Sequence, residues 1–166
     1  MKENTAQARE LLKQAVKSEI DGQRFYKFLA GKTTNADARR KLSGLADDEI
    51  RHEKALRSMY KNIYNEELTE LPEKGVGVLS QFFANPESRE DLSEVQYIDM
   101  AIEAELAATN YYKEEAQRAK TDQFRKIFEG MAAEEFSHYE LLQAEKAALG
   151  GNYYWFSFGD TTPMED

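Results

Sequence analysis

The sequence predicts an all-α protein, a four-helix bundle with one long crossover connection between its second and third helices. Residues 5–64 and 93–149 contain no proline and few glycines, and both stretches are rich in strong helix formers such as Ala, Leu, Glu, Lys and Gln. Apolar residues within them recur at steps of three and four, which is the period of an amphipathic helix rather than of a strand. Each stretch has one short polar break, so four long helices are expected.

The first two helices are expected over about residues 5–30 and 35–64. Gly31 follows the first helix, and glycine is common just past a helix C-terminus. Asn35 suits the N-terminal cap of the second helix, because its side chain can accept hydrogen bonds from the first free backbone N–H groups. The link between the two helices is short, so they should form an antiparallel hairpin.

The last two helices are expected over about residues 93–120 and 122–149. Ser93 and Gln96 form the pattern Ser-x-x-Gln, which indicates a capping box at the start of the third helix. The fourth helix ends before two consecutive glycines. This link is also short, so a second antiparallel hairpin is expected.

Residues 65–92 connect the two hairpins and are too long for a simple turn. They contain two prolines and two glycines, which stop helices. They also carry an apolar patch, formed by Val76, Val78, Leu79, Phe82 and Phe83. A structureless loop of this length is unusual, so we expect a crossover that runs along the bundle. We expect residues 1–166 to form one domain, with the bundle at about 5–149.

The C-terminal segment, residues 150–166, is rich in aromatic side chains. They are Tyr153, Tyr154, Trp155, Phe156 and Phe158. Such a cluster either closes one end of the bundle or forms a contact with a second subunit. No sequence rule separates these two interpretations, and both stay open.

Composition and charge exclude several classes of protein. The chain has 166 residues, no cysteine and a net charge of −9. The lack of cysteine excludes disulfides, zinc ribbons, thiol catalysis and any iron site held by cysteines. The negative charge disfavours nucleic acid as a partner. No apolar run is long enough to cross a bilayer, and the first residues lack the apolar core of a signal peptide, so we expect a cytoplasmic protein with no membrane partner.

The chain contains two copies of one helical-hairpin pattern, offset by 86 residues. Its two histidines each follow a glutamate by three residues, and the two Glu-x-x-His pairs are in register within the repeat. A lone glutamate in the first helix of each copy is in register as well. The six residues are Glu19, Glu49, His52, Glu105, Glu135 and His138.

All six residues lie on the apolar stripes of their helices, near mid-helix, and should therefore point into the bundle core. Burying a carboxylate costs several kcal/mol unless its charge is neutralised. Four glutamates bring about four negative charges, which two divalent cations would balance, and each histidine adds a nitrogen ligand. Small residues beside the lone glutamates, such as Ala15 and Gly22, leave space for ligands. The pattern therefore predicts a two-metal carboxylate centre.

Other polar residues near the stripes are less distinctive. Tyr26 and Tyr112 lie seven residues after the lone glutamates, on the same helix faces. They either hydrogen-bond a ligating carboxylate or are ordinary core tyrosines, and both interpretations are open. Four acidic residues lie off the stripes and are expected to be solvated: Asp47, Asp48, Glu53 and Glu134.

The six-residue pattern resembles that of the ferritin-like superfamily and, within it, of the rubrerythrin-like proteins, over about residues 5–149. The resemblance implies a ferritin-like bundle, two iron ions and often a homodimer. Rubrerythrins reduce hydrogen peroxide with electrons relayed from a rubredoxin domain, and these 166 residues contain no cysteine to build one. Rubrerythrins also carry an additional metal-binding glutamate one turn after the glutamate of the third helix, where this chain has Ala108.

The leading hypothesis for function is an oxidoreductase whose two iron ions react with peroxide or dioxygen, in peroxide reduction or in the oxidation of ferrous iron. Glu49 and Glu135 would bridge the ions, and electrons would come from a separate carrier protein. Glu19 with His52 and Glu105 with His138 would complete the two sides. The alternatives are a protein that only binds and handles iron, and a bundle whose metal only stabilises the fold. Manganese or a mixed pair would suit the same ligands.

Overall fold

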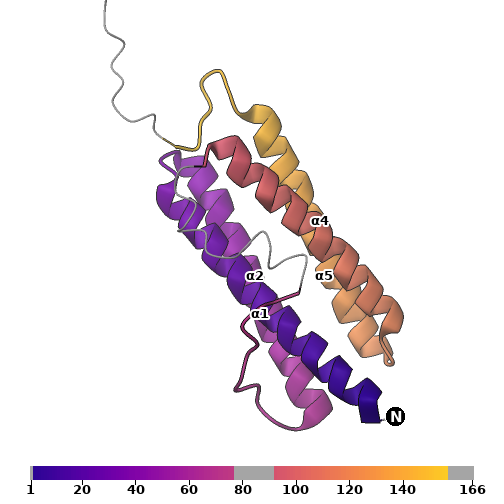
Figure 1. Ribbon diagram of the computed structural model, residues 1–166. Helices are drawn as coiled ribbons and strands as arrows, with labels where there is room; N and C mark the ends of the chain where they lie inside the picture. The colour runs from indigo at the N-terminus through magenta and orange to yellow at the C-terminus, as the bar shows by residue number, and fades with distance from the viewer. Residues whose placement is uncertain (1, 77–91, 157–166) are drawn as a thin grey trace, which may run out of the picture.

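The computed structural model describes residues 2–76 and 92–156, which are mostly helical and contain no strand. Four long helices are described: α1 Lys2–Lys32, α2 Ala36–Tyr64, α4 Glu94–Arg118 and α5 Asp122–Ala148. Figure 1 shows α1 beside α2 and α4 beside α5, each pair forming an antiparallel hairpin. The predicted all-α four-helix bundle is confirmed. None of the described helices contains a window apolar enough to cross a membrane.

The helix ends follow local hydrogen bonding. The side chain of Asn35 accepts two hydrogen bonds of 3.0 Å from backbone N–H groups in the first turn of α2. The predicted capping box at Ser93 is present at the start of α4. The end of α1 differs from the prediction, because Gly31 continues the helix. Thr33 closes this helix instead, since its hydroxyl donates to the carbonyl of Leu29 at 2.6 Å.

Aromatic side chains pack the first hairpin against the second. The ring of Tyr97, on α4, lies 6.5 Å from that of Phe25 and 6.0 Å from that of Phe28, both on α1, measured between ring centroids. Phe25 and Tyr97 are fully buried. Edge-to-face pairs of this kind add to the stabilisation that burial of the rings provides. The apolar core is therefore continuous between the hairpins.

The described part of the C-terminal segment closes one end of the bundle. Trp155 is 1% exposed, and its indole N–H donates to Glu145 of α5 at 3.0 Å. Its backbone carbonyl accepts a hydrogen bond of 2.8 Å from the N–H of Thr34, in the turn between α1 and α2. Trp155 thus bridges the two hairpins, which supports the capping interpretation for this residue. Phe158 lies outside the described residues.

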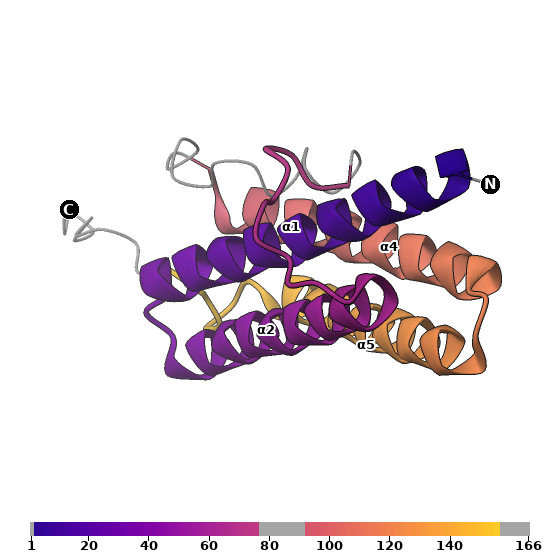
Figure 2. The same cartoon turned by 90° about the horizontal axis from the view of Figure 1, so that it is seen from below.

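The described start of the crossover, residues 65–76, leaves the end of α2 and passes across α1 (Figure 2). The backbone N–H of Val76 donates to the Ser18 hydroxyl oxygen at 2.7 Å. A Cβ added to Gly75 would lie 2.3 Å from the same oxygen, so a glycine is needed for this approach. Residues 77–91 of the predicted crossover, with most of its apolar patch, lie outside the described residues.

Candidate metal centre

The six residues that the sequence singled out converge near the middle of the bundle, and each is exposed by 5% or less. The lone glutamates come from α1 and α4, and the Glu-x-x-His pairs come from α2 and α5. A spacing of three places the glutamate and histidine of a pair on one helix face, about one turn apart. The residues are Glu19 on α1, Glu49 and His52 on α2, Glu105 on α4, and Glu135 and His138 on α5.

These side chains form two overlapping groups, each able to hold a metal ion. Within a group, one ligand atom from every residue lies within 4.8 Å of the others. The first group is Glu19, Glu49, His52 and Glu135, and the second is Glu49, Glu105, Glu135 and His138. Glu49 and Glu135 belong to both groups, so these two carboxylates lie where bridging ligands would.

Both histidines turn the same ring nitrogen toward the cluster. His52 Nδ1 lies 3.1 Å from Glu135 Oε1 and 3.5 Å from Glu19 Oε2. His138 Nδ1 lies 3.1 Å from Glu135 Oε2 and 3.6 Å from Glu105 Oε1. Glu135 therefore offers one oxygen to each imidazole, and Nδ1 is the nitrogen that each ring turns toward the cluster.

Burial and like charge dominate the electrostatics of the glutamates. Burial, followed by the charges of Glu135 and Glu19, raises the pKa of Glu49 well above its usual value. Burial and the charge of Glu135 also raise the pKa of Glu105. Glu135 behaves in the opposite way. Burial alone would raise its pKa, but hydrogen bonds from both histidines hold that pKa well below the usual range.

The histidines are correspondingly basic. Burial would lower the pKa of His52, but its hydrogen bond to Glu135 and the nearby carboxylate of Glu19, 3.5 Å away, outweigh burial and raise the pKa to about 11. Burial also opposes the charged form of His138, but the carboxylate of Glu105, 3.6 Å away, and the hydrogen bond to Glu135 raise its pKa to about 11. Protons therefore supply positive charge to the metal-free cluster. Even so, Glu19 Oε2 is buried and has no hydrogen-bond partner in the described part of the chain, which is costly for a carboxylate oxygen.

The two tyrosines hydrogen-bond the lone glutamates across the bundle. The hydroxyl of Tyr26 on α1 donates to Glu105 on α4, and the hydroxyl of Tyr112 on α4 donates to Glu19 on α1. Burial, followed by the charge of these carboxylates, raises the pKa of both phenols, so both remain proton donors. The structure thus shows the carboxylate contact that one of the two sequence interpretations expected.

Two acidic residues that were expected to be solvated are partly exposed, as expected, but each also contacts a histidine. Asp48 Oδ2 lies 2.9 Å from His138 Nε2, and Glu134 Oε2 lies 3.0 Å from His52 Nε2. The contacts were not predicted because a core stripe marks only the residues that face the bundle axis, whereas Nε2 of each ring faces the seam between α2 and α5. A signal was available, since Asp48 and Glu134 are themselves 86 residues apart and each precedes a glutamate of the cluster.

Gly22, which lies one turn after Glu19, makes room for a carboxylate of the cluster. A Cβ at Gly22 would lie 3.3 Å from Cδ of Glu49, a separation that is tighter than ordinary packing allows. The corresponding residue in the second copy of the repeat is Ala108, which is buried. The absence of a side chain at Gly22 therefore lets α1 and the side chain of Glu49 approach closely.

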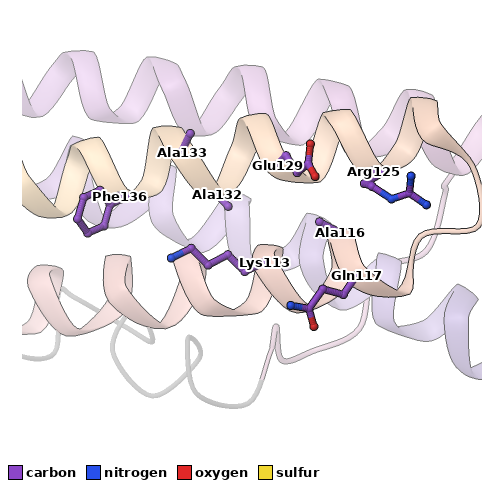
Figure 3. Close-up of a pocket in the computed structure, with 8 residues that line it drawn as sticks. All are labelled: Lys113, Ala116, Gln117, Arg125, Glu129, Ala132, Ala133 and Phe136. Atoms are coloured by element: carbon purple, nitrogen blue, oxygen red, sulfur yellow. The ribbon is translucent and has the colours of Figure 1, made fainter.

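Two pockets on the described surface differ in their relation to the cluster. One, of about 600 Å³, lies between α4 and α5 and is lined by residues that include Lys113, Arg125 and Phe136, but by none of the six (Figure 3). The other, of about 440 Å³, lies between α2 and α5 and is lined in part by Asp48 and His138. The second pocket therefore leads from the surface to the His138 side of the cluster.

The chain is similar to known proteins both in sequence and in structure. The family model for Rubrerythrin matches residues 10–146. No curated protein matches the chain. Among solved structures, a hypothetical protein from Pyrococcus furiosus is similar, with a TM-score of 0.72 and 31% sequence identity over 84% of this chain and 87% of that one. The bundle therefore has the ferritin-like fold, and the chain belongs to the rubrerythrin family.

Proposed function

We propose that this chain is a di-iron carboxylate oxidoreductase that reacts with hydrogen peroxide or dioxygen and receives electrons from a separate carrier protein. The observation that supports this most directly is the pair of overlapping ligand groups that share Glu49 and Glu135. Two metal positions with two carboxylates in common would hold their ions close together. Such an arrangement suits a reaction in which one small oxidant takes up two electrons.

The residues present fit such a pair of ions. Four carboxylates and two imidazoles are ligands that iron and manganese both accept. The raised pKa of Glu49 and the unpartnered Oε2 of Glu19 both indicate a need for positive charge that the side chains alone do not meet. Two divalent cations would meet it, because their charge balances that of four ionised glutamates.

Each side chain has a definite role in this proposal. Glu49 and Glu135 would be shared by the two ions, Glu19 and His52 would hold one of them, and Glu105 and His138 would hold the other. Bound iron would supply one electron from each ion to the oxidant. The buried tyrosine hydroxyls orient the two lone glutamates, and the burial of all six residues limits access of water.

Ala108 distinguishes this chain from the rubrerythrin pattern described above. It lies one turn after Glu105 and is 6% exposed, so its methyl group occupies a buried position where that pattern has a carboxylate. Each metal position then has one glutamate and one histidine of its own. We expect His52 and His138 to remain ligands in both oxidation states, because no additional carboxylate is available to replace either of them.

The test begins with metal content. The purified chain is loaded with ferrous iron without oxygen, and we expect about two ions per chain. Glu135→Ala should lose most of this iron, because Glu135 belongs to both ligand groups. Glu140→Ala is the matched control, since Glu140 is an exposed glutamate on the same helix and should leave the iron content unchanged. Fewer than two ions in the wild-type chain would refute the two-metal proposal.

The second stage separates the possible activities. The loaded chain is mixed rapidly with peroxide and, separately, with dioxygen, and its absorption spectrum is followed. A change within minutes supports the oxidoreductase. Two bound ions with no spectral change would instead indicate a metal that stabilises the fold, and a far faster reaction with dioxygen would favour oxidation of iron as the function. We also propose that the chain forms a homodimer, and sedimentation of the same sample tests this.

A further inference from the structure

A single arginine on the outside of the bundle contacts the outer carboxylates of both histidines. Arg51 Nη2 lies 2.5 Å from Asp48 Oδ1 and 2.9 Å from Glu134 Oε2. The other oxygen of Asp48 accepts from His138, and the same oxygen of Glu134 accepts from His52. The five side chains form one continuous hydrogen-bonded arc, from the histidine of α5 to the histidine of α2.

We propose that Arg51 is a positioning residue that holds both outer carboxylates in place, so that both imidazoles keep Nδ1 turned toward the metal positions. The arc crosses the seam between α2 and α5 three times, once through Arg51 and Glu134 and once at each histidine. His52 of α2 is held by a carboxylate of α5, and His138 of α5 is held by a carboxylate of α2. One guanidinium therefore sets the orientation of both halves together. This inference rests on the proposed function, because it concerns histidines that bind metal.

Charge explains why the arc depends on the arginine. Asp48 and Glu134 both lie within 3 Å of the same guanidinium nitrogen, so they are close to each other and carry like charge. Their side chains are 33% and 41% exposed, so each could turn outward into water if the guanidinium were absent. A carboxylate that turned outward would release the imidazole nitrogen that donates to it.

The second copy of the repeat has no arginine at the position that corresponds to Arg51, so Arg51 is the arginine that contacts the outer carboxylates of both copies. The residue that corresponds to Arg51 in the second copy is Ser137, and its hydroxyl donates to the carbonyl of Ala133 within its own helix at 3.1 Å. Ser137 therefore supplies no positive charge to the seam. The ordinary alternative is an exposed ion pair with no further role, since Arg51 is 58% exposed and such pairs contribute little to stability. The two interpretations differ in what they predict for the histidines.

The test uses the fact that the chain has two histidines, so the ring signals are easily counted. In the metal-free chain labelled with ¹⁵N, both Nε2–H protons should exchange slowly with water, because each is held by a carboxylate. In Arg51→Gln both should exchange at least about tenfold faster. Arg51→Lys keeps the charge and should recover part of the protection. Arg125→Gln is the matched control, because Arg125 also pairs with an aspartate three residues earlier, at 2.6 Å, on an exposed helix face.

Metal affinity provides the second readout. Titration with Mn²⁺ alone should show affinity about 10–100-fold weaker in Arg51→Gln, partly restored in Arg51→Lys and unchanged in Arg125→Gln. Circular dichroism should show the same helix content in every variant. Unchanged exchange rates and unchanged Mn²⁺ affinity in Arg51→Gln would overturn the inference. If the wild-type chain binds no metal, the proposed function fails, and the exchange measurement on the metal-free chain still decides whether Arg51 positions the histidines.

Discussion

Replacing Tyr112 with phenylalanine would remove the hydroxyl that donates a hydrogen bond to Glu19. Glu19 Oε1 accepts a hydrogen bond from Tyr112, and Glu19 Oε2 has no hydrogen-bond partner in the described residues. The variant would therefore leave this buried carboxylate with no hydrogen bond among the described residues, and with His52 Nδ1 at 3.5 Å from Oε2. Both side chains are almost completely buried, so water cannot readily take the place of the hydroxyl.

The size of the effect follows from the kind of hydrogen bond that is lost. A buried hydrogen bond to a charged group contributes about 1.5–3 kcal/mol, so Tyr112→Phe should cost the metal-free protein about 2 kcal/mol. In a domain of this size, 1 kcal/mol shifts the melting temperature by about 2–4 °C, so the expected loss is about 4–8 °C. Metal affinity should fall about 10–100-fold, because the lone glutamate is no longer held in place.

The assay compares thermal melts and metal titrations of four proteins. Besides the wild type and Tyr112→Phe, it includes Tyr26→Phe, which removes the equivalent hydrogen bond to Glu105 and should behave alike. The control is Tyr111→Phe, since the Tyr111 hydroxyl contacts only a backbone carbonyl among the hydrogen bonds described, at 3.4 Å. If Tyr112→Phe and Tyr111→Phe lost equal stability and metal affinity stayed unchanged in both, the assigned role of the tyrosines would be refuted.

Two further predictions concern protonation and packing. The pKa values of Glu49 and both histidines are raised in the folded state, so the native metal-free protein binds extra protons and should lose stability as pH rises from the ordinary values of 4.5 and 6.5 toward about 11. The loaded protein should show the opposite trend between pH 5 and 8, because its ligands must be deprotonated. A flat pH profile for the melting temperature of the metal-free protein would contradict this account. Gly22→Ala should weaken metal binding, because the added Cβ would lie 3.3 Å from Glu49, whereas Gly44→Ala meets nothing within 4 Å and should stabilise α2 by up to about 1 kcal/mol. Equal metal affinity in these two glycine variants would count against the packing argument.

The sequence predicts those features of the fold and of the cluster that depend on contacts within one helix. The spacing of apolar residues defines which face of each helix is buried, and it places Glu49 and His52 on that face without knowledge of any other helix. The cap at Asn35 could be predicted for the same reason, since its partners lie two and three residues away. The prediction that α1 ends before Gly31 was wrong, because the hydroxyl of Thr33 hydrogen-bonds the Leu29 carbonyl and ends the helix two residues later.

The remaining features depend on how separate helices are placed against each other. The contact between Asp48 and His138 requires α2 and α5 to be rotated so that the ring reaches the seam, and periodicity within a helix carries no record of that rotation. The hydrogen bond between Thr34 and Trp155 joins residues far apart in the chain, so no local sequence pattern predicts it. The repeat pairs Asp48 with Glu134 in the sequence, but the histidine that each one contacts is known only from the tertiary structure.

The 86-residue repeat also allows the two halves of the cluster to differ from each other in sequence. Each hairpin contributes two glutamates and one histidine, so two identical hairpins related by a two-fold axis would build the same cluster. In a symmetric dimer of hairpins, every substitution would alter both metal positions at once. Joining the halves in one chain removes that constraint, and the pairs Gly22 with Ala108 and Arg51 with Ser137 show that the copies already differ beside the cluster. Residues beside one half of the cluster can then change while those beside the other half are preserved.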